Sequence, residues 1–107
     1  MPKKPPKKKR PKKDTRSDDE VMFWFGNHLM SYFGDDGYDD RIIKELRELF
    51  PYYPLVEQNF RRGIDIALGF SDEDSIRLVE HYANRQARTA DQARAWLSEL
   101  RDKLFAP

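Results

Sequence analysis

Acidic side chains gather around one glycine in the first half of the chain, in a stretch that also holds an aromatic ring. The stretch consists of Asp35, Asp36, Gly37, Tyr38, Asp39 and Asp40. Clustered carboxylates are ligands that calcium prefers, and a glycine occupies the sixth position of its EF-hand loop. Here that register places Tyr32, Gly34 and Ile43 at the first, third and twelfth positions, and none of them is a carboxylate. The spacing therefore does not predict a calcium site.

Turn formation and helix capping explain most of these aspartates. Gly and Asp are typical of turns, and an aspartate in the first turn of a helix interacts favourably with the helix dipole. These roles do not explain why so much negative charge is concentrated on one loop, with Tyr38 at its centre. An aromatic ring among exposed carboxylates suits the recognition of a basic protein surface. We therefore predict a partner-binding site made of Asp35, Asp36, Tyr38, Asp39 and Asp40.

The first 16 residues carry nine Lys or Arg side chains and a single acid, Asp14. Prolines lie among these charges and Met1 is the only large apolar residue, so the segment buries nothing that offsets the entropy of ordering it. Residues 17–107 hold eleven basic and eighteen acidic side chains. The sequence thus predicts a disordered polybasic arm, residues 1–16, ahead of an acidic domain, residues 17–107.

This polybasic arm admits three interpretations. Residues 6–10, Pro-Lys-Lys-Lys-Arg, resemble a nuclear import signal, a pattern that also arises by chance. Cations on an arm also neutralise nucleic-acid phosphates, and without interleaved aromatic residues such binding would be nonspecific. The third interpretation is a solvated extension that touches the acidic body. The candidate phosphate-binding residues are Lys3, Lys4, Lys7, Lys8, Lys9, Arg10, Lys12 and Lys13.

No pattern of catalytic residues stands out. The chain has no Gly-rich phosphate loop, no HExxH zinc motif and no nucleophile-elbow serine, and neither His28 nor His81 has a nucleophile beside it. We interpret both histidines as structural or solvated. Without cysteine, the chain forms no disulfide and no Cys-ligated metal site. We therefore expect neither enzyme activity nor a metal or cofactor.

The apolar runs indicate where the protein works. The longest of them, residues 21–25, is far shorter than the roughly 20 residues that span a bilayer. Acidic residues separate it from the basic segment and no small-residue cleavage site follows, so a secretory signal is not predicted. We expect no membrane association, and action in the cytoplasm, or in the nucleus if the cell is eukaryotic.

Local signals predict an all-α domain, a compact bundle of about five short helices. Ser17 with Glu20 makes a capping box that opens the first helix, and Thr89 with Gln92 opens the last one in the same way. Apolar residues recur at three- and four-residue steps inside each segment. The expected helices cover residues 17–33, 40–50, 54–68, 71–83 and 89–104.

Most large apolar residues are assigned to the core. Phe23 and Trp24 widen the apolar stripe of the first helix, which predicts that this helix is buried on more than one side. Leu55 and Trp96 lie on the stripes of the third and last helices. A glycine inside a helix costs about 1 kcal/mol relative to alanine, so Gly63 indicates close packing at that position.

The last two helices are expected to form an antiparallel hairpin with a short turn near Arg88. This arrangement resembles a DNA-binding helix-turn-helix, but the second helix carries Asp91, Glu99 and Asp102 among its cations. Such a face is a poor match for the phosphates of a major groove. Packing is the simpler role for its apolar stripe.

Short motifs suggest a family. Tyr32-Phe33 is followed by the acidic, aromatic stretch 35–39, and far downstream Ala95-Trp96-Leu97 continues to residues 100–104, Leu-Arg-Asp-Lys-Leu. Together these pieces resemble the small helical immunity proteins of bacterial contact-dependent growth inhibition systems. Members of that family neutralise toxins, commonly nucleases, by binding them tightly in the cytoplasm. The resemblance implies the same role here, with a basic toxin domain as partner.

Overall fold

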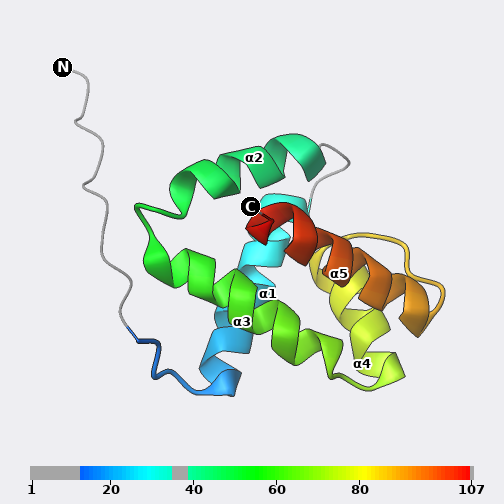
Figure 1. The fold of residues 1–107 in the computed structure, drawn as a ribbon. Helices are drawn as coiled ribbons and strands as arrows, with labels where there is room; N and C mark the ends of the chain where they lie inside the picture. The colour runs from blue at the N-terminus through cyan, green and yellow to red at the C-terminus, as the bar shows by residue number, and fades with distance from the viewer. Residues whose placement is uncertain (1–12, 35–38, 107) are drawn as a thin grey trace.

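The computed structural model describes residues 13–34 and 39–106, and within these ranges every regular element is a helix. The predicted all-α bundle of five short helices is confirmed (Figure 1). The fourth helix continues directly into one π-helical segment, named η1. The elements are α1 (Asp18–Phe33), α2 (Asp39–Leu49), α3 (Pro54–Leu68), α4 (Asp72–Arg77), η1 (Leu78–Tyr82) and α5 (Ala90–Phe105).

Side-chain caps fix where these helices begin. The Oγ of Ser17 accepts from the backbone N–H of Glu20 at 3.2 Å, which opens α1 as predicted. The Oγ1 of Thr89 accepts from the N–H of Gln92 at the same distance and opens α5. Each cap satisfies one of the backbone donors that a helix start leaves without a partner.

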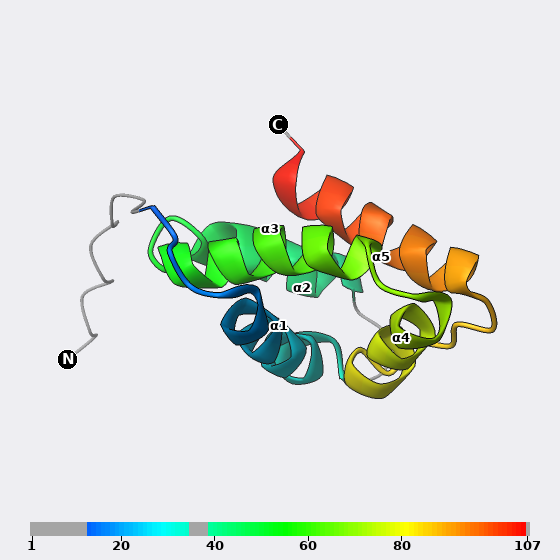
Figure 2. The same ribbon diagram turned by 90° about the horizontal axis from the view of Figure 1, so that it is seen from below.

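Helix α3 lies between α1 and α5 and contacts both of them (Figure 2). The approach of α1 to α3 depends on Gly63, because a Cβ built there would lie 2.4 Å from Cγ of Phe25. This confirms the close packing expected at Gly63. The ring of Phe60 occupies the centre of the core, edge-on to Phe25 with 5.8 Å between ring centroids and edge-on to Phe33 at 6.4 Å.

Three apolar assignments were wrong. Phe23 and Trp24 on α1 are 64% and 44% exposed, and Leu55 on α3 is 60% exposed. With 3.6 residues per turn, Phe23 lies nearly opposite the buried Phe25 on the helix, so both cannot face the core. Trp96 is half-buried, with its ring edge-on to Phe33 at 5.7 Å. An apolar residue beside a stripe therefore does not establish that it is buried.

Two connections also differ from expectation. The link between η1 and α5 covers residues 83–89 and is longer than the predicted short turn.

Residues 13–16, which the sequence assigned to the arm, contact the helical domain. The carboxylate of Asp14 is 6% exposed and lies between Arg16 at 2.8 Å and Arg62 of α3 at 3.2 Å. Residues 1–12 lie outside the described part of the chain.

Candidate protein-binding surface

Arg85 joins the end of α1 to the start of α2. Its Nη1 donates to the backbone oxygen of Phe33 at 2.9 Å, and its Nε donates to Oδ2 of Asp39 at 3.4 Å. Its Nη2 forms an ion pair with the other carboxylate oxygen of Asp39. Beside it, Asn84 adopts a positive φ of 53° and donates from Nδ2 to the backbone oxygen of Gly34 at 3.1 Å. Both ends of the acidic loop, residues 35–38, are thus held by one short segment.

The predicted binding residues fall into two groups. Asp35, Asp36 and Tyr38 lie outside the described residues. Asp39 and Asp40 open α2 and are both paired, Asp39 with Arg85 and Asp40 with Lys103 at 3.1 Å. Both carboxylates therefore already have a cation of this chain beside them, Asp39 in a partly buried pair and Asp40 in an exposed one.

The outward side of α1 is unusually apolar for a surface helix. Phe23, Trp24 and Met30 expose 64%, 44% and 52% of their surface, and the rings of Phe23 and Trp24 pack edge-on at 5.3 Å. The 100° step of a helix puts all three within one 120° sector, opposite the side that packs on the core. Exposed apolar clusters of this kind mark interaction sites. We call Asp19, Glu20, Phe23, Trp24 and Met30 the outward face of α1.

The charge on this outward face is entirely negative. Helix α1 contains three acids, all in its first turn, and no Lys or Arg. Asp19 and Glu20 are exposed and form no ion pair with any residue of the described ranges. At the other end of α1 the chain continues into Asp35 and Asp36. The face thus presents aromatic rings beside carboxylates that are free to pair with a partner's cations.

His28 supports the side of this face next to α3. Its Nε2 lies 2.9 Å from Nδ2 of the buried Asn59, and its ring stacks on Phe60 with centroids 5.7 Å apart. Burial, assisted by the Arg16 cation, lowers the pKa of His28. Nε2 accepts the amide hydrogen in the tautomer that carries the ring proton on Nδ1, and Oδ1 of Asn59 is buried without a hydrogen bond to the described residues. The expected structural role fits this packing, and His81 is exposed against Tyr82.

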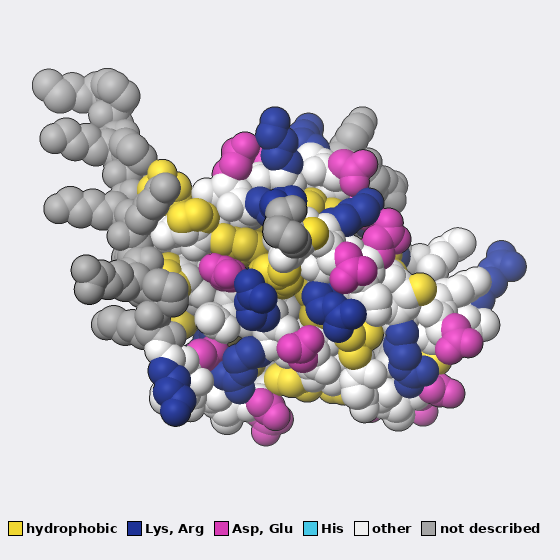
Figure 3. Space-filling view, in the orientation of Figure 1, with side chains coloured by type: hydrophobic (Ala, Val, Ile, Leu, Met, Phe, Trp, Pro, Cys, Tyr) yellow, Lys and Arg dark blue, Asp and Glu magenta, His cyan; other side chains and the backbone are white. Residues whose placement is uncertain are grey.

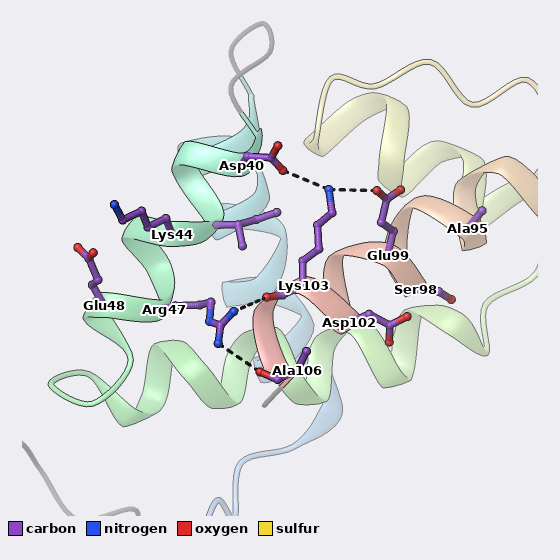
Figure 4. Close-up of a pocket in the computed structure, with 11 residues that line it drawn as sticks. Asp40, Lys44, Arg47, Glu48, Ala95, Ser98, Glu99, Asp102, Lys103 and Ala106 are labelled. Carbon is purple, nitrogen blue, oxygen red and sulfur yellow. Dashed lines mark hydrogen bonds and ion pairs between the residues drawn. The ribbon is translucent and has the colours of Figure 1, made fainter.

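A groove of about 1150 Å³ runs between α2 and α5 (Figure 4). Lys103 crosses it and pairs with Asp40 and Glu99, each at 3.1 Å. Arg47 donates to the backbone oxygens of Lys103 and Ala106 at 3.3 and 3.2 Å, which caps the end of α5. The charged groups at the centre of the groove thus already pair with one another, whereas Asp19 and Glu20 of the outward face form no ion pair with the described residues.

Cations and acids alternate over the face of the domain that Figure 3 shows. Several of them form pairs between or within helices, such as Arg94 with Asp72 at 2.8 Å and Arg77 with Glu73 at 2.9 Å. Among the predicted phosphate-binding residues, Lys13 alone lies in the described part of the chain, where it is exposed. The other seven, Lys3, Lys4, Lys7, Lys8, Lys9, Arg10 and Lys12, lie outside it.

Sequence reasoning missed both the outward face of α1 and the Arg85 clamp. A signal for the face was present, because Phe23 and Trp24 lie outside the three- and four-residue steps of the buried stripe. No local signal identifies Arg85, since the carboxylate it binds is 46 positions away in the chain. A long-range polar contact of this kind produces no periodic pattern in the sequence.

Comparisons of the chain with protein-family models, curated proteins and solved structures found no match. Within residues 13–34 and 39–106, no group of three or more His, Asp or Glu side chains is placed to hold a metal ion. None of the helices in those ranges combines the length and the apolar character that a bilayer crossing requires.

Proposed function

We propose that this protein is a non-catalytic binding module that recognises a basic protein through the outward face of α1. The observation that carries the proposal is the set of exposed aromatic rings beside unpaired carboxylates on a helix without cations. Aromatic side chains dominate binding energy at interfaces, and complementary charge raises the association rate. A partner with a basic, partly apolar surface satisfies both parts of the face.

A second copy of the chain fits the outward face of α1 less well than a basic protein does. Two copies packed through α1 would cover Asp19 and Glu20 without a cation from either helix, because α1 has no Lys or Arg, and a parallel arrangement would place carboxylates opposite carboxylates. Like charges brought together across an interface cost free energy. The charge on the face thus favours a different, positively charged protein.

Toxin neutralisation is the specific form of this function that we propose. The motifs around Tyr32 and Trp96 resemble contact-dependent growth inhibition immunity proteins, and an acidic module is suited to a toxin whose surface binds nucleic acid. In this role the protein acts in the cytoplasm. Asp35, Asp36 and Tyr38, which the sequence predicts to bind the partner, stay part of this proposal.

Nonspecific nucleic-acid binding is the second candidate. It is favoured by residues 1–12, which carry seven cations and no acid. On this proposal the arm supplies the affinity through phosphate contacts, which weaken steeply with salt. On the face that Figure 3 shows, cations and acids are mixed, so on this proposal the phosphate contacts fall to the arm.

The test uses the product of the gene beside the one that encodes this chain. That product is co-expressed with the full chain, and both complex formation and growth of the host are measured. The proposal predicts a stable complex and rescue of growth from a toxic neighbour. Asp19→Asn should slow association several-fold at low salt, because a carboxylate that steers the partner is lost.

Asp91→Asn is the matched control for this charge change. Asp91 is also an exposed aspartate in the first turn of a helix, α5, and forms no ion pair with the described residues. The two substitutions therefore alter helix-dipole interactions equally. They differ in which surface of the protein loses a negative charge. Equal association rates for both variants would contradict the proposed surface. A neighbour that neither binds nor is toxic, together with DNA binding that requires residues 1–12, would establish the second candidate instead.

A further inference from the structure

Phe23 and Trp24 form a corner of two exposed rings on the outward face of α1. The ring centroids lie 5.3 Å apart and the ring planes meet at 79°, so the rings stand nearly perpendicular to each other. Phe23 is 64% and Trp24 44% exposed, so part of each ring is open to solvent. The face of an aromatic ring attracts cations, and that of Trp does so most strongly. The corner is therefore a place where a cationic group of a partner can bind.

Glu20 lies one helical turn before this corner. It precedes Phe23 by three positions and Trp24 by four, and the 100° step of the helix places it between the two rings around the helix axis. Residues three and four apart are neighbours on a helix surface, with Cβ atoms about 5–6 Å apart. Aromatic side chains on a helix also lean toward its N-terminus, which is the direction of Glu20. A cation on the Trp24 ring is thus within reach of a carboxylate.

The Glu20 carboxylate accepts no hydrogen bond from the described residues. In a complete capping box the acid at this position accepts the backbone N–H of the capping residue. Here the Oγ of Ser17 accepts from the N–H of Glu20 at 3.2 Å, but the return bond between these two described residues is absent. Arg16 attracts Glu20 through its charge, yet its Nε and Nη2 donate to Asp14 at 2.9 and 2.8 Å. The Glu20 oxygens are therefore available to the donors of a partner.

The turn after the corner adds no positive charge. Asn27 donates from Nδ2 to the backbone oxygen of Phe23 at 3.0 Å, and its Oδ1 accepts no hydrogen bond from the described residues. His28, whose ring centroid lies 6.5 Å from that of Trp24, is neutral at pH 7 because burial lowers its pKa. Helix α1 itself has no Lys or Arg. Carboxylate and amide oxygens thus flank the rings, and no side chain of this helix competes with an incoming cation.

This arrangement distinguishes arginine from lysine. A guanidinium is planar and weakly hydrated, so it stacks on a ring while its N–H groups donate in parallel to one carboxylate. A lysine ammonium is compact and strongly hydrated, and it does not combine the two contacts in this way. We propose that the outward face of α1 binds an arginine side chain, whose guanidinium stacks on Trp24 beside Phe23 and donates to the carboxylate of Glu20. That this arginine belongs to a basic protein partner rests on the proposed function, whereas the preference for arginine is a property of the free site.

Three short peptides test this preference on the full chain: tetra-arginine, tetra-lysine and tetra-citrulline. Each is titrated into isotope-labelled protein, and the indole N–H signals of Trp24 and of Trp96 on α5 are followed by NMR. Tetra-arginine should shift the Trp24 signal more than the Trp96 signal, with a dissociation constant at least about threefold lower than that of tetra-lysine. Citrulline keeps the planar shape of arginine without its charge, so tetra-citrulline should shift neither signal. Equal dissociation constants for tetra-arginine and tetra-lysine, or equal shifts of the two tryptophans, would overturn the proposal.

Two variants assign the contacts, with the backbone amide of Asn27 as the signal. Trp24→Leu should remove the preference for tetra-arginine, because the ring on which the guanidinium stacks is lost. Glu20→Gln should weaken the binding of tetra-arginine several-fold, because the guanidinium loses its carboxylate. Asp91→Asn removes the same charge from the first turn of α5 and should leave that binding unchanged. An arginine preference that survives Trp24→Leu, or equal effects of Glu20→Gln and Asp91→Asn, would also overturn the proposal.

Because the peptides take the place of the partner, this inference and the proposed function fail separately. If the product of the neighbouring gene binds through the outward face while the peptides show no arginine preference, only the inference is wrong. If the peptides show the preference at Trp24 while no basic protein binds the face, the arginine site stands and the proposed function is wrong.

Discussion

Replacing Gly63 by alanine is expected to destabilise the domain although alanine favours helices. A Cβ at this position would lie 2.4 Å from Cγ and 2.7 Å from Cβ of Phe25. Phe25 is fully buried and packs edge-on against Phe60, so its ring has little room to move. Overpacking of a core costs about 1–3 kcal/mol, and the helix propensity of alanine returns about 1 kcal/mol. Because the Cβ of Phe25 is itself in the clash, we expect a net loss of about 2 kcal/mol.

Thermal and denaturant unfolding of Gly63→Ala measure this loss. For a domain of this size about 2 kcal/mol corresponds to a fall in Tm of roughly 8–16 °C. Gly69→Ala is the control, because a Cβ at Gly69 would meet only the backbone oxygen of Ile66 at an ordinary 3.4 Å. Its Tm should change by little. An unchanged or raised Tm for Gly63→Ala would show that α1 and α3 do not approach as closely as the structure indicates.

Three further variants test buried polar and charged groups. Ser75 is fully buried, and its Oγ has no hydrogen bond to the described residues. Ser75→Ala should therefore raise the free energy of unfolding by about 1 kcal/mol. Ser31 is exposed, and Ser31→Ala should not raise it. The folded-state pKa of Asp14 is depressed, so its contribution is present above about pH 4 and lost as the pH falls below that value. Denaturant unfolding between pH 6 and 2 should show this loss in the wild type and a smaller one in Asp14→Asn. The folded-state pKa of His28 is also lowered, so the unfolded chain binds its proton first and stability should decrease as the pH falls below 6.5, an effect absent from His28→Gln.

Local sequence signals accounted for the helices. The caps at Ser17 and Thr89 and the proline at position 54 are short-range features, and the structure begins α1, α5 and α3 at or directly after them. Such signals depend on hydrogen bonds within a few residues, which sequence spacing records directly. For the same reason the close packing at Gly63 could be anticipated, since a glycine inside a helix requires a cause.

The candidate binding surface was harder to predict from the sequence than the helices were. Helix α1 has large apolar residues on both sides, so the pattern alone does not select which side packs on α3. The structure selects the side of Phe25, next to Gly63, and leaves Phe23 and Trp24 outside. The pairing of Asp39 with Arg85 likewise depends on the three-dimensional fold. Consequently the sequence identified the acidic loop but not the aromatic face that precedes it.

The most direct test of the proposed binding surface is the dissociation constant of the complex with the product of the neighbouring gene. It is measured for the full chain and for a variant carrying Phe23→Ala and Trp24→Ala. Phe23 is 64% and Trp24 44% exposed, so their truncation should destabilise the free protein less than truncation of a fully buried ring, and its unfolding transition is measured alongside. If they anchor the partner, the variant should bind at least about 30-fold more weakly, equivalent to one hot-spot residue of 2 kcal/mol or more. Equal dissociation constants for the two proteins would contradict the assignment of the outward face of α1 as the binding surface.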